Sequence, residues 1–218
     1  MDLIDSLIQE GWLKTPRIIE AFREIKRVDF LPQEIKDLAE LNEALSIGYG
    51  QTISQPLVVA FMLELLQPKP GEKILDIGSG SGWTSALLAH IVSGGELKSK
   101  SKNQKSKING RVIAIEVIPE LKEFGERNVD KYDFTKKGIV EFICADGSKG
   151  YKKEAPYDKI LASASAESLP GVWKEQLKIS GRIVTPIGSS IWLFIKKSES
   201  DVEEIEYPGF VFVPLITK

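Results

Sequence analysis

The stretch "GEKILDIGSGSGW", residues Gly71–Trp83, decides the fold. Its first part is a short apolar run, which predicts a buried strand ending at Asp76. Glycines at 78, 80 and 82 then allow a tight turn and let a ligand approach the backbone closely. Residues 84–92 predict a helix whose N-terminus points at that ligand. A bare strand-to-helix turn is the plainer alternative, but it needs neither three glycines nor the acid.

The same alternation of strand and helix continues after this unit. Strands are expected within 110–118, 139–147, 157–166 and 181–188, and helices within 119–132 and 169–178. Short apolar runs that alternate with amphipathic helices are typical of a parallel sheet covered on both faces. We therefore expect an α/β protein with a doubly wound, Rossmann-like sheet, whose ligand-binding core spans residues 56–188.

The two ends of the chain have a different pattern. Residues 2–11 and 15–25 predict two helices, the second with Thr15 as its cap and Pro16 at its first position. Three further strands, predicted at 190–197, 203–207 and 210–216, follow one another without intervening helices, which suits antiparallel edge strands. We expect one domain over 1–218, with a helical, substrate-side region at 1–55 and C-terminal strands at 189–218.

Composition excludes several classes of protein. The net charge of −2 gives no general attraction to nucleic acid or to an anionic membrane. The single cysteine, Cys144, leaves no disulfide framework, and its apolar strand predicts a core position. Neither a signal peptide nor a spanning helix is expected, so a soluble cytoplasmic protein is the default. Residues 94–110, with five lysines and three serines, predict a solvated surface loop.

The ligand of the glycine turn can be narrowed by its chemistry. A dinucleotide fingerprint needs its third glycine one residue later than Gly82, and the lysine of a phosphate-binding loop is absent. An acid at Asp76 suits a ligand with a positively charged amino group, such as S-adenosylmethionine. Glu116, at the end of the second strand, would accept hydrogen bonds from ribose hydroxyls. Asp146, with Gly147, would take the adenine amino group, although a turn-forming Asp-Gly is the alternative.

A second unusual stretch is "IGYGQTISQP", residues 47–56. It predicts a glycine-bordered loop that leads into a helix starting near Pro56. Spacing alone favours Ser54 as the cap of that helix, a role worth about 1 kcal/mol. A hydroxyl held out for chemistry is the other reading.

The motifs together resemble the protein-L-isoaspartate O-methyltransferase family. The resemblance is carried, in chain order, by "AFREIKRVDFLP", "IGYGQTISQP", "ILDIGSGSGW", "IAIE", "ADG", "EAPYDKI", "LKISGRIVTPIG" and "FVPL". The glycine-rich and acidic motifs are shared by many class I methyltransferases, whereas the Gly-Gln-Thr-Ile-Ser block is specific to this family. The implied fold is a class I S-adenosylmethionine-dependent methyltransferase with N-terminal helical additions and antiparallel C-terminal strands.

The resemblance also implies a set of site residues. Ser54 would be the active-site residue, and Thr52, Ile53 and Ser54 would bind the substrate. No metal is expected. The cofactor S-adenosylmethionine would be bound by Asp76, Gly78, Ser79, Gly80, Gly82, Glu116, Asp146 and Gly147. The implied partners are damaged proteins or peptides that carry isoaspartyl residues, the chain acting as a monomer without nucleic acid or membrane.

One segment departs from the family pattern. After the fourth strand the family usually has threonine or glycine, then an alanine-rich stretch and a proline. This chain has Ser163, Ala164, Ser165 and Ala166, and then Glu167. The stretch stays small, so space beside the cofactor is kept, but the extra hydroxyls are unusual. They bear on peptide preference and catalytic efficiency more than on cofactor binding.

The expected chemistry needs no strong base. An isoaspartyl carboxylate has a pKa near ~4 and is already the nucleophile at neutral pH. Ser54 is therefore interpreted as a positioning hydroxyl. His90, the only histidine, is expected to be a packed or surface helix residue, and Trp83 to serve packing or to border the cofactor. Three alternatives stay open: a methyltransferase of this fold with another acceptor, a cofactor-binding protein that has lost catalysis, and, as an outsider, a nicotinamide dehydrogenase.

Overall fold

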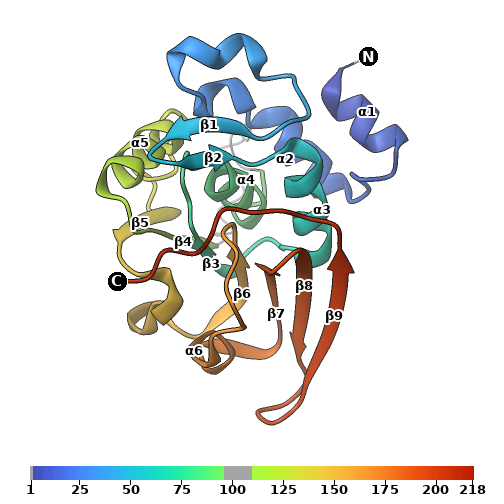
Figure 1. Cartoon of the computed structure of the whole chain (residues 1–218), viewed down its shortest axis with the longest axis vertical. Helices are drawn as coiled ribbons and strands as arrows, with labels where there is room; N and C mark the ends of the chain where they lie inside the picture. The colour runs from blue at the N-terminus through green and yellow to red at the C-terminus, as the bar shows by residue number, and fades with distance from the viewer. Residues whose placement is uncertain (1, 96–109) are drawn as a thin grey trace, which may run out of the picture.

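The computed structural model describes residues 2–95 and 110–218 (Figure 1). The lysine- and serine-rich segment expected at 94–110 therefore lies almost wholly outside the described residues.

A seven-stranded sheet forms the centre of the molecule, in the order β5-β4-β3-β6-β7-β8-β9. The strands β3 to β7 run parallel, and β8 and β9 are antiparallel additions at one edge. The chain winds outward from β3 to β5 and then returns to place β6 on the other side of β3, which makes β3 the topological switch point. The expected doubly wound class is confirmed. The strand bounds are β3 (Lys73–Ile77), β4 (Arg111–Glu116), β5 (Val140–Cys144), β6 (Tyr157–Ala162), β7 (Leu177–Ile187), β8 (Ser190–Lys196) and β9 (Val202–Pro208).

The two faces of the sheet are covered differently. Helices α3 (Pro56–Leu66), α4 (Trp83–Val92) and α5 (Pro119–Asp130) share one apolar cluster with alternate residues of the strands, and α2 (Pro16–Glu24) adds to it. The opposite face packs around Trp173 of α6 (Gly171–Glu175). Because side chains alternate along a strand, Ile74 faces α4 and Leu75 faces the other side. Asp76 consequently points toward the helical layer.

The N-terminal region combines helices with a small hairpin. Both expected helices, α1 (Leu3–Gln9) and α2, are present, followed by 3₁₀ turns at Arg27–Phe30 and Gln33–Leu38. The prediction of a loop at residues 47–56 is wrong in one respect. Much of this stretch belongs to the antiparallel pair β1 (Leu45–Gly48) and β2 (Gln51–Ile53). The turn between them has positive φ at Gly48, Tyr49 and Gly50. Across the hairpin Leu45 pairs with Ile53, Ser46 with Thr52 and Gly48 with Gln51.

The capping role considered for Ser54 is also wrong. Helix α3 begins at Pro56, so its cap position is Gln55, whose side chain makes no capping bond. The orphan N–H of Leu57 instead donates to Oδ1 of Asn42, 3.0 Å away. The first turn of α3 is therefore satisfied from a distant segment, which leaves the Ser54 hydroxyl outside the capping arrangement.

Two predictions at the sheet edges are corrected. Residues 210–216 form no strand; they run back across the carboxyl ends of the central strands, with an isolated bridge from Pro214 to Ser165 (Figure 1). Cys144 is exposed and not part of the core, because it ends β5, the edge strand of the sheet. Both errors arise because an apolar run does not reveal how many neighbours its segment has.

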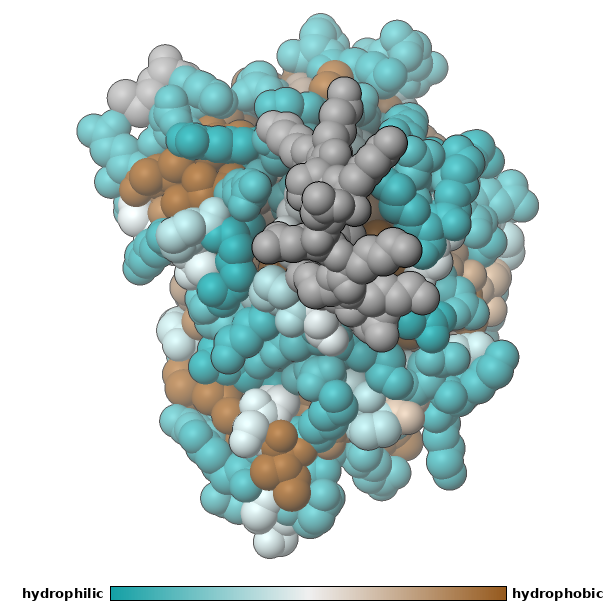
Figure 2. Space-filling model, turned by 180° about the vertical axis from the view of Figure 1, so that it is seen from behind, coloured by the Kyte–Doolittle hydropathy of each residue, from teal (hydrophilic) through white to brown (hydrophobic). Residues whose placement is uncertain are grey.

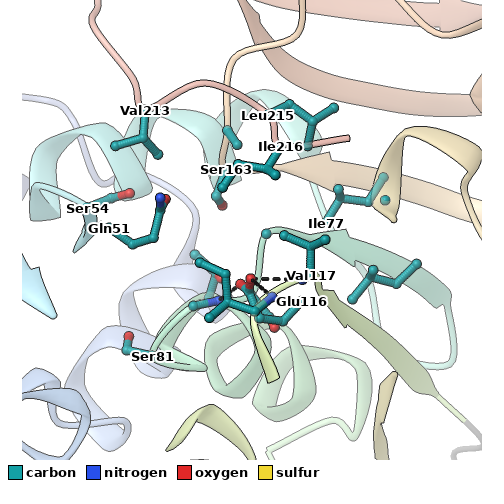
Figure 3. A pocket seen from close by; sticks show the side chains of 18 of the residues that line it. Gln51, Ser54, Ile77, Ser81, Glu116, Val117, Ser163, Val213, Leu215 and Ile216 are labelled. Carbon is teal, nitrogen blue, oxygen red and sulfur yellow. Dashed lines mark hydrogen bonds between the residues drawn. The ribbon is translucent and has the colours of Figure 1, made fainter. Parts of the chain in front are cut away.

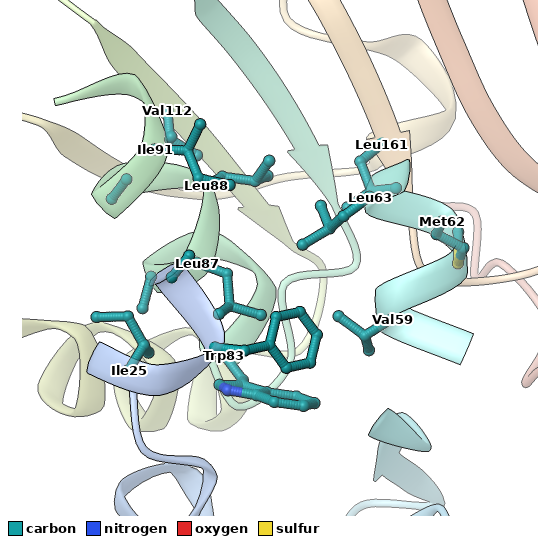
Figure 4. Close-up of a cluster of buried hydrophobic side chains, with 14 of the residues drawn as sticks. Ile25, Val59, Met62, Leu63, Trp83, Leu87, Leu88, Ile91, Val112 and Leu161 are labelled. Atoms are coloured by element: carbon teal, nitrogen blue, oxygen red, sulfur yellow. The ribbon is translucent and has the colours of Figure 1, made fainter. Parts of the chain in front are cut away.

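The core reaches from the sheet to the pocket described below. Figure 4 shows Trp83, the first residue of α4, beside Leu87 and Val59, where the N-terminal half of the molecule meets the sheet.

The surface seen from behind is mostly hydrophilic, with apolar residues in separate patches (Figure 2). Within residues 2–95 and 110–218, no helix has the length and hydropathy required to cross a bilayer.

Candidate functional site

A pocket lies where the carboxyl ends of β3, β4 and β6 meet, at the switch point of the sheet (Figure 3). It holds about 720 Å³ of space, its open mouth included. The sheet ends and the glycine turn form its floor, the β1–β2 hairpin one wall, and the segment after β9 its cover. The lining residues used below are Gln51, Thr52, Ile53, Ser54, Gly78, Ser79, Gly80, Trp83, Glu116, Gly147, Ser163, Val213, Leu215 and Ile216.

The glycine turn divides into a ligand side and a packing side. Gly78, Ser79 and Gly80 line the pocket. Gly82 does not, and a Cβ there would lie 2.7 Å from the carbonyl oxygen of Gly125 in α5, at a φ of +84°. Gly82 is thus required for the close contact between the turn and α5. The buried hydroxyl of Ser79 has no hydrogen-bond partner among the described residues, so it is available to a ligand.

Asp76 lies behind the turn and outside the pocket lining. Its Oδ2 accepts hydrogen bonds from the hydroxyls of Thr84 (3.0 Å) and Ser85 (2.6 Å) at the start of α4. Burial raises the pKa of Asp76 to about 6, against the opposing effect of these two hydrogen bonds. Its Oδ1 is buried and has no partner among the described residues. The geometry gives Asp76 a contact with α4, and its expected contact with a ligand stays a prediction.

Glu116 is the ionisable group of the pocket floor. Its Oε1 accepts from the backbone N–H groups of Val117 (2.8 Å) and Ile118 (3.0 Å), and its Oε2 from that of Gly80 (2.9 Å). A carboxylate has about four acceptor sites, so Oε2 retains one. That arrangement fixes the orientation of the carboxylate and suits a hydroxyl donor, as a ribose would offer.

Asp146 stands beside the pocket, and Gly147 lines it. Burial would raise the pKa of Asp146, but hydrogen bonds from the Ser148 hydroxyl and from the backbone N–H groups of Lys218 and Ser148 together lower it to about 2. A Cβ at Gly147 would lie 2.4 Å from Cγ2 of Ile77. Gly147 therefore leaves a flat surface without a side chain just after β5, which suits an aromatic base. The role of Asp146 toward that base stays a prediction.

The hairpin wall presents its residues in alternation. Ile53 is buried and Gln51 half-buried, whereas Thr52 lies on the exposed face opposite Ser46. Ser54 follows the strand, and Figure 3 shows its hydroxyl and the amide of Gln51 directed into the pocket. Thr52, which the sequence predicts as a site residue, and Gln51, which it does not, both line the pocket, but their side chains lie on opposite faces of β2. The alternation that separates them appears only once residues 51–53 are known to be a strand.

The remaining walls contain groups that sequence reasoning also missed. Ser163, at the end of β6, and the segment Val213–Ile216 both line the pocket. Backbone bonds join them through Ser165, whose N–H donates to the carbonyl of Val213 (2.8 Å) and whose carbonyl accepts from Leu215 (2.8 Å). The unusual serines after the fourth strand, Ser163 and Ser165, were the sequence signal for this wall of the pocket. The packing of residues 213–216 against them was not predictable from the sequence.

The pocket holds few charges. Among the described residues its lining has no lysine, arginine or histidine, and Glu116 is its one carboxylate. No group of metal-ligating side chains occurs within residues 2–95 and 110–218. His90 is buried in α4, away from the lining, while Trp83 both packs in the core and borders the pocket. The arrangement can bind a nucleoside on the Glu116 side and hold an anion with neutral donors on the hairpin side.

Comparisons with known proteins match the whole chain to one family. The model of the protein-L-isoaspartate(D-aspartate) O-methyltransferase family matches residues 1–218. A protein-L-isoaspartate O-methyltransferase of Methanopyrus kandleri is 38% identical over 218 residues, covering 98% of this chain and 89% of its relative. Protein-L-isoaspartate O-methyltransferase 2 of Archaeoglobus fulgidus is 43% identical over 202 residues, covering 91% and 84%.

Two solved structures have the same fold. A crystal structure from Plasmodium falciparum, described as a putative protein-L-isoaspartate O-methyltransferase in complex with S-adenosyl-L-homocysteine, superposes with a TM-score of 0.83 at 22% identity, covering 99% of this chain and 97% of that one. A second protein-L-isoaspartate O-methyltransferase superposes with a TM-score of 0.81 at 26% identity, covering 97% and 64%.

Proposed function

The chain belongs to the protein-L-isoaspartate(D-aspartate) O-methyltransferase family, and on that premise we propose that it methylates the carboxylate of L-isoaspartyl residues in damaged proteins and peptides. The methyl donor is S-adenosylmethionine. The observation that carries the proposal is the pocket itself, in which a nucleoside-type floor at the switch point faces a hairpin built from the family-specific Gly-Gln-Thr-Ile-Ser block.

The cofactor is assigned to the floor of the pocket. Glu116 accepts from a ribose hydroxyl through its remaining acceptor site, and Gly147 gives the adenine a flat surface. Gly78, Ser79 and Gly80 carry the amino-acid end, while Asp76 and Gly82 support the turn from behind. Asp146 is assigned the adenine amino group, which would replace one of the present partners of its Oδ2, Lys218 N at 3.0 Å or Lys149 Nζ at 3.3 Å. When bound, the cofactor supplies a methyl group on a sulfonium cation.

The acceptor is assigned to the hairpin wall, where this chain has to hold an anion in place. A carboxylate with a pKa near ~4 is ionised at neutral pH, so the site needs no general base. Among the described lining residues the one carboxylate is Glu116, which is assigned to the cofactor. The Ser54 hydroxyl donates a hydrogen bond to the acceptor carboxylate and fixes the direction from which the carboxylate approaches the methyl group. Thr52 and Ile53 contribute their main chain, since Thr52 is on the exposed face of β2.

The cover of the pocket accounts for the remaining part of the mechanism. An anion and a cation combine into neutral products, so charge disperses in the transition state and a dry site favours the reaction. Ile53, Val213 and Leu215 give that site apolar walls. Both the hairpin and the C-terminal segment contribute to one pocket with the sheet, which supports a single methyltransferase domain over residues 1–218. We propose that it acts as a monomer.

The test is transfer of a labelled methyl group from S-adenosylmethionine to an isoaspartyl peptide, with the aspartyl peptide of the same sequence as control. The proposal expects base-labile label on the isoaspartyl peptide alone. Label on both peptides would contradict the acceptor assignment and favour a methyltransferase of broader specificity. Binding of the cofactor without label on either peptide would indicate a protein that has lost catalysis.

A further inference from the structure

The walls of the pocket carry more hydrogen-bond donors than the family block explains. Ser54 has two polar neighbours that line the same pocket, Gln51 on the hairpin and Ser163 at the end of β6. Figure 3 shows the polar ends of all three side chains directed into the same part of the pocket. We propose that Gln51 and Ser163 bind the acceptor carboxylate together with Ser54, one from each side. This inference rests on the proposed function and names further residues of its acceptor side.

These three side chains are not engaged elsewhere in the described structure. Among the described residues, none of them has a side-chain hydrogen bond. Polar neighbours close to them in sequence are already engaged: Nε2 of Gln55 donates to the carbonyl of Asn42 at 2.8 Å, and the hydroxyl of Ser165 faces the carbonyl of Gly188 at 3.4 Å. Half-buried donors that meet no protein acceptor are suited to a polar ligand.

The charges around the pocket also favour neutral donors for the acceptor. A carboxylate that enters this pocket meets no cationic side chain, because the described lining has no lysine, arginine or histidine. Glu116 lies on the cofactor side and repels a second carboxylate. Neutral donors must therefore hold the acceptor. They do so without an ion pair from the described lining, which would lower the nucleophilicity of the carboxylate.

Backbone hydrogen bonds hold both walls of the pocket in place. Gln51 is in β2, within the paired hairpin, so its side chain has a fixed face. The N–H of Ser163 donates to the carbonyl of Ile77 at 2.9 Å, which ties the end of β6 to that of β3. Ala166 continues this attachment by donating to the carbonyl of Pro186 at 3.1 Å. Donors on separate fixed walls can hold the carboxylate plane in one orientation.

The experiment measures methyl transfer to an isoaspartyl peptide and, in the same preparations, the Kd of S-adenosylhomocysteine by calorimetry. Gln51→Ala and Ser163→Ala should each lower kcat/KM for the peptide on the order of tenfold, the value of one hydrogen bond to a charged group. The Kd of S-adenosylhomocysteine should change by less than about twofold. Ser46→Ala, on the exposed face of the same hairpin, is the matched control and should retain the wild-type rate.

Conservative variants separate donation from packing. Ser163→Thr keeps a hydroxyl and should recover most of the rate that Ser163→Ala loses. Gln51→Glu has the shape of the amide but places a negative charge opposite the acceptor. It should be slower than Gln51→Ala at pH 8, and the difference between the two rates should shrink as the pH falls toward the pKa of a glutamate, near ~4.3.

Three outcomes would overturn the inference while leaving the proposed function intact: wild-type rates in both alanine variants, equal loss of cofactor binding and transfer, or a Gln51→Glu deficit that does not depend on pH. Absence of label with the wild-type protein would instead contradict the proposed function itself.

Discussion

The two sides of the pocket differ in how their polar groups are used. On the cofactor side, Glu116 receives three backbone N–H groups and Asp76 two hydroxyls, so the carboxylates are oriented by the protein itself. On the acceptor side, Gln51, Ser54 and Ser163 have side chains without partners among the described residues. In the proposed function, the carboxyl ends of the strands thus bind a cofactor that is the same in every reaction, while the hairpin and tail provide neutral donors for the carboxylate of a peptide.

This difference has a physical origin. A buried carboxylate is costly unless it is hydrogen-bonded, which accounts for the hydrogen bonds that the protein makes to Glu116 and to Oδ2 of Asp76. Neutral amides and hydroxyls at the rim of a pocket cost less, because water can hydrate them. We therefore expect changes on the cofactor side to affect both binding and folding, and changes on the acceptor side to affect transfer alone.

Glu116→Ala should have the largest effect on binding. It removes the acceptor for the ribose hydroxyls and leaves the N–H groups of Gly80, Val117 and Ile118 unpaired. Charge-assisted hydrogen bonds of this kind lead us to expect about a hundredfold higher Kd for S-adenosylhomocysteine by calorimetry. Glu120→Ala, an exposed acid in the first turn of α5, is the control and should bind normally. A Kd within threefold of wild type would contradict the assignment of Glu116.

Asp76→Asn should change the pH dependence of stability. The folded pKa of about 6 exceeds the ordinary 3.8, so the native state holds the proton more tightly than the unfolded chain. The contribution of Asp76 to stability is therefore full below pH 4 and is lost as the pH rises through 6. Relative to Asp76→Asn, the wild-type free energy of unfolding should fall by about 3 kcal/mol from pH 4 to pH 8. Urea denaturation across this range measures the difference, and parallel curves would refute it.

Arg27 contacts both the hairpin side and Trp83 at the start of α4. Its replacement should reduce methylation of the peptide more than binding of the cofactor. The guanidinium is buried; it donates to the carbonyls of Leu41 (2.9 Å), Glu43 (2.7 Å) and Ser54 (3.3 Å), and it lies over the ring of Trp83. Burial lowers its pKa to about 10, so it remains a cation at neutral pH.

Arg27→Lys keeps the charge but lacks the planar fork that reaches several carbonyls. We expect kcat/KM for an isoaspartyl peptide to drop about tenfold, with the Kd of S-adenosylhomocysteine within about threefold, because the backbone at Ser54 is less well held. Peptide kinetics and calorimetry on the same sample check this. An unchanged kcat/KM would show that the Arg27 contacts do not position Ser54.

Thr52→Val should have the smallest effect. The side chain of Thr52 lies on the exposed face of β2, and only its main chain is assigned to the pocket. Methyl transfer should stay within about twofold of wild type, and stability within about 0.5 kcal/mol. A tenfold loss of kcat/KM in steady-state kinetics would place the Thr52 hydroxyl in the site. It would also contradict the assignment of the hairpin's acceptor-binding side chain to Gln51 in preference to Thr52.

Much of this organisation was predictable from the sequence. The glycine turn and the acid at Glu116 follow from patterns local to one strand–turn–helix unit, and the structure places Gly78, Gly80 and Glu116 in one pocket. The hairpin was missed because β1 and β2 have four and three residues, too short to show alternation. The tail at 210–216 was misassigned because an apolar run has the same pattern whether it joins a sheet or covers a pocket. Gln51 and Ser163 could be grouped only after these two segments were placed.

The most direct test of the division between the two sides is Ser54→Ala, studied by single-turnover methyl transfer to an isoaspartyl peptide and by calorimetry with S-adenosylhomocysteine on the same preparation. The account predicts a transfer rate reduced on the order of tenfold or more, with cofactor affinity within about twofold of wild type. An unchanged transfer rate, or a parallel loss of cofactor binding, would contradict it.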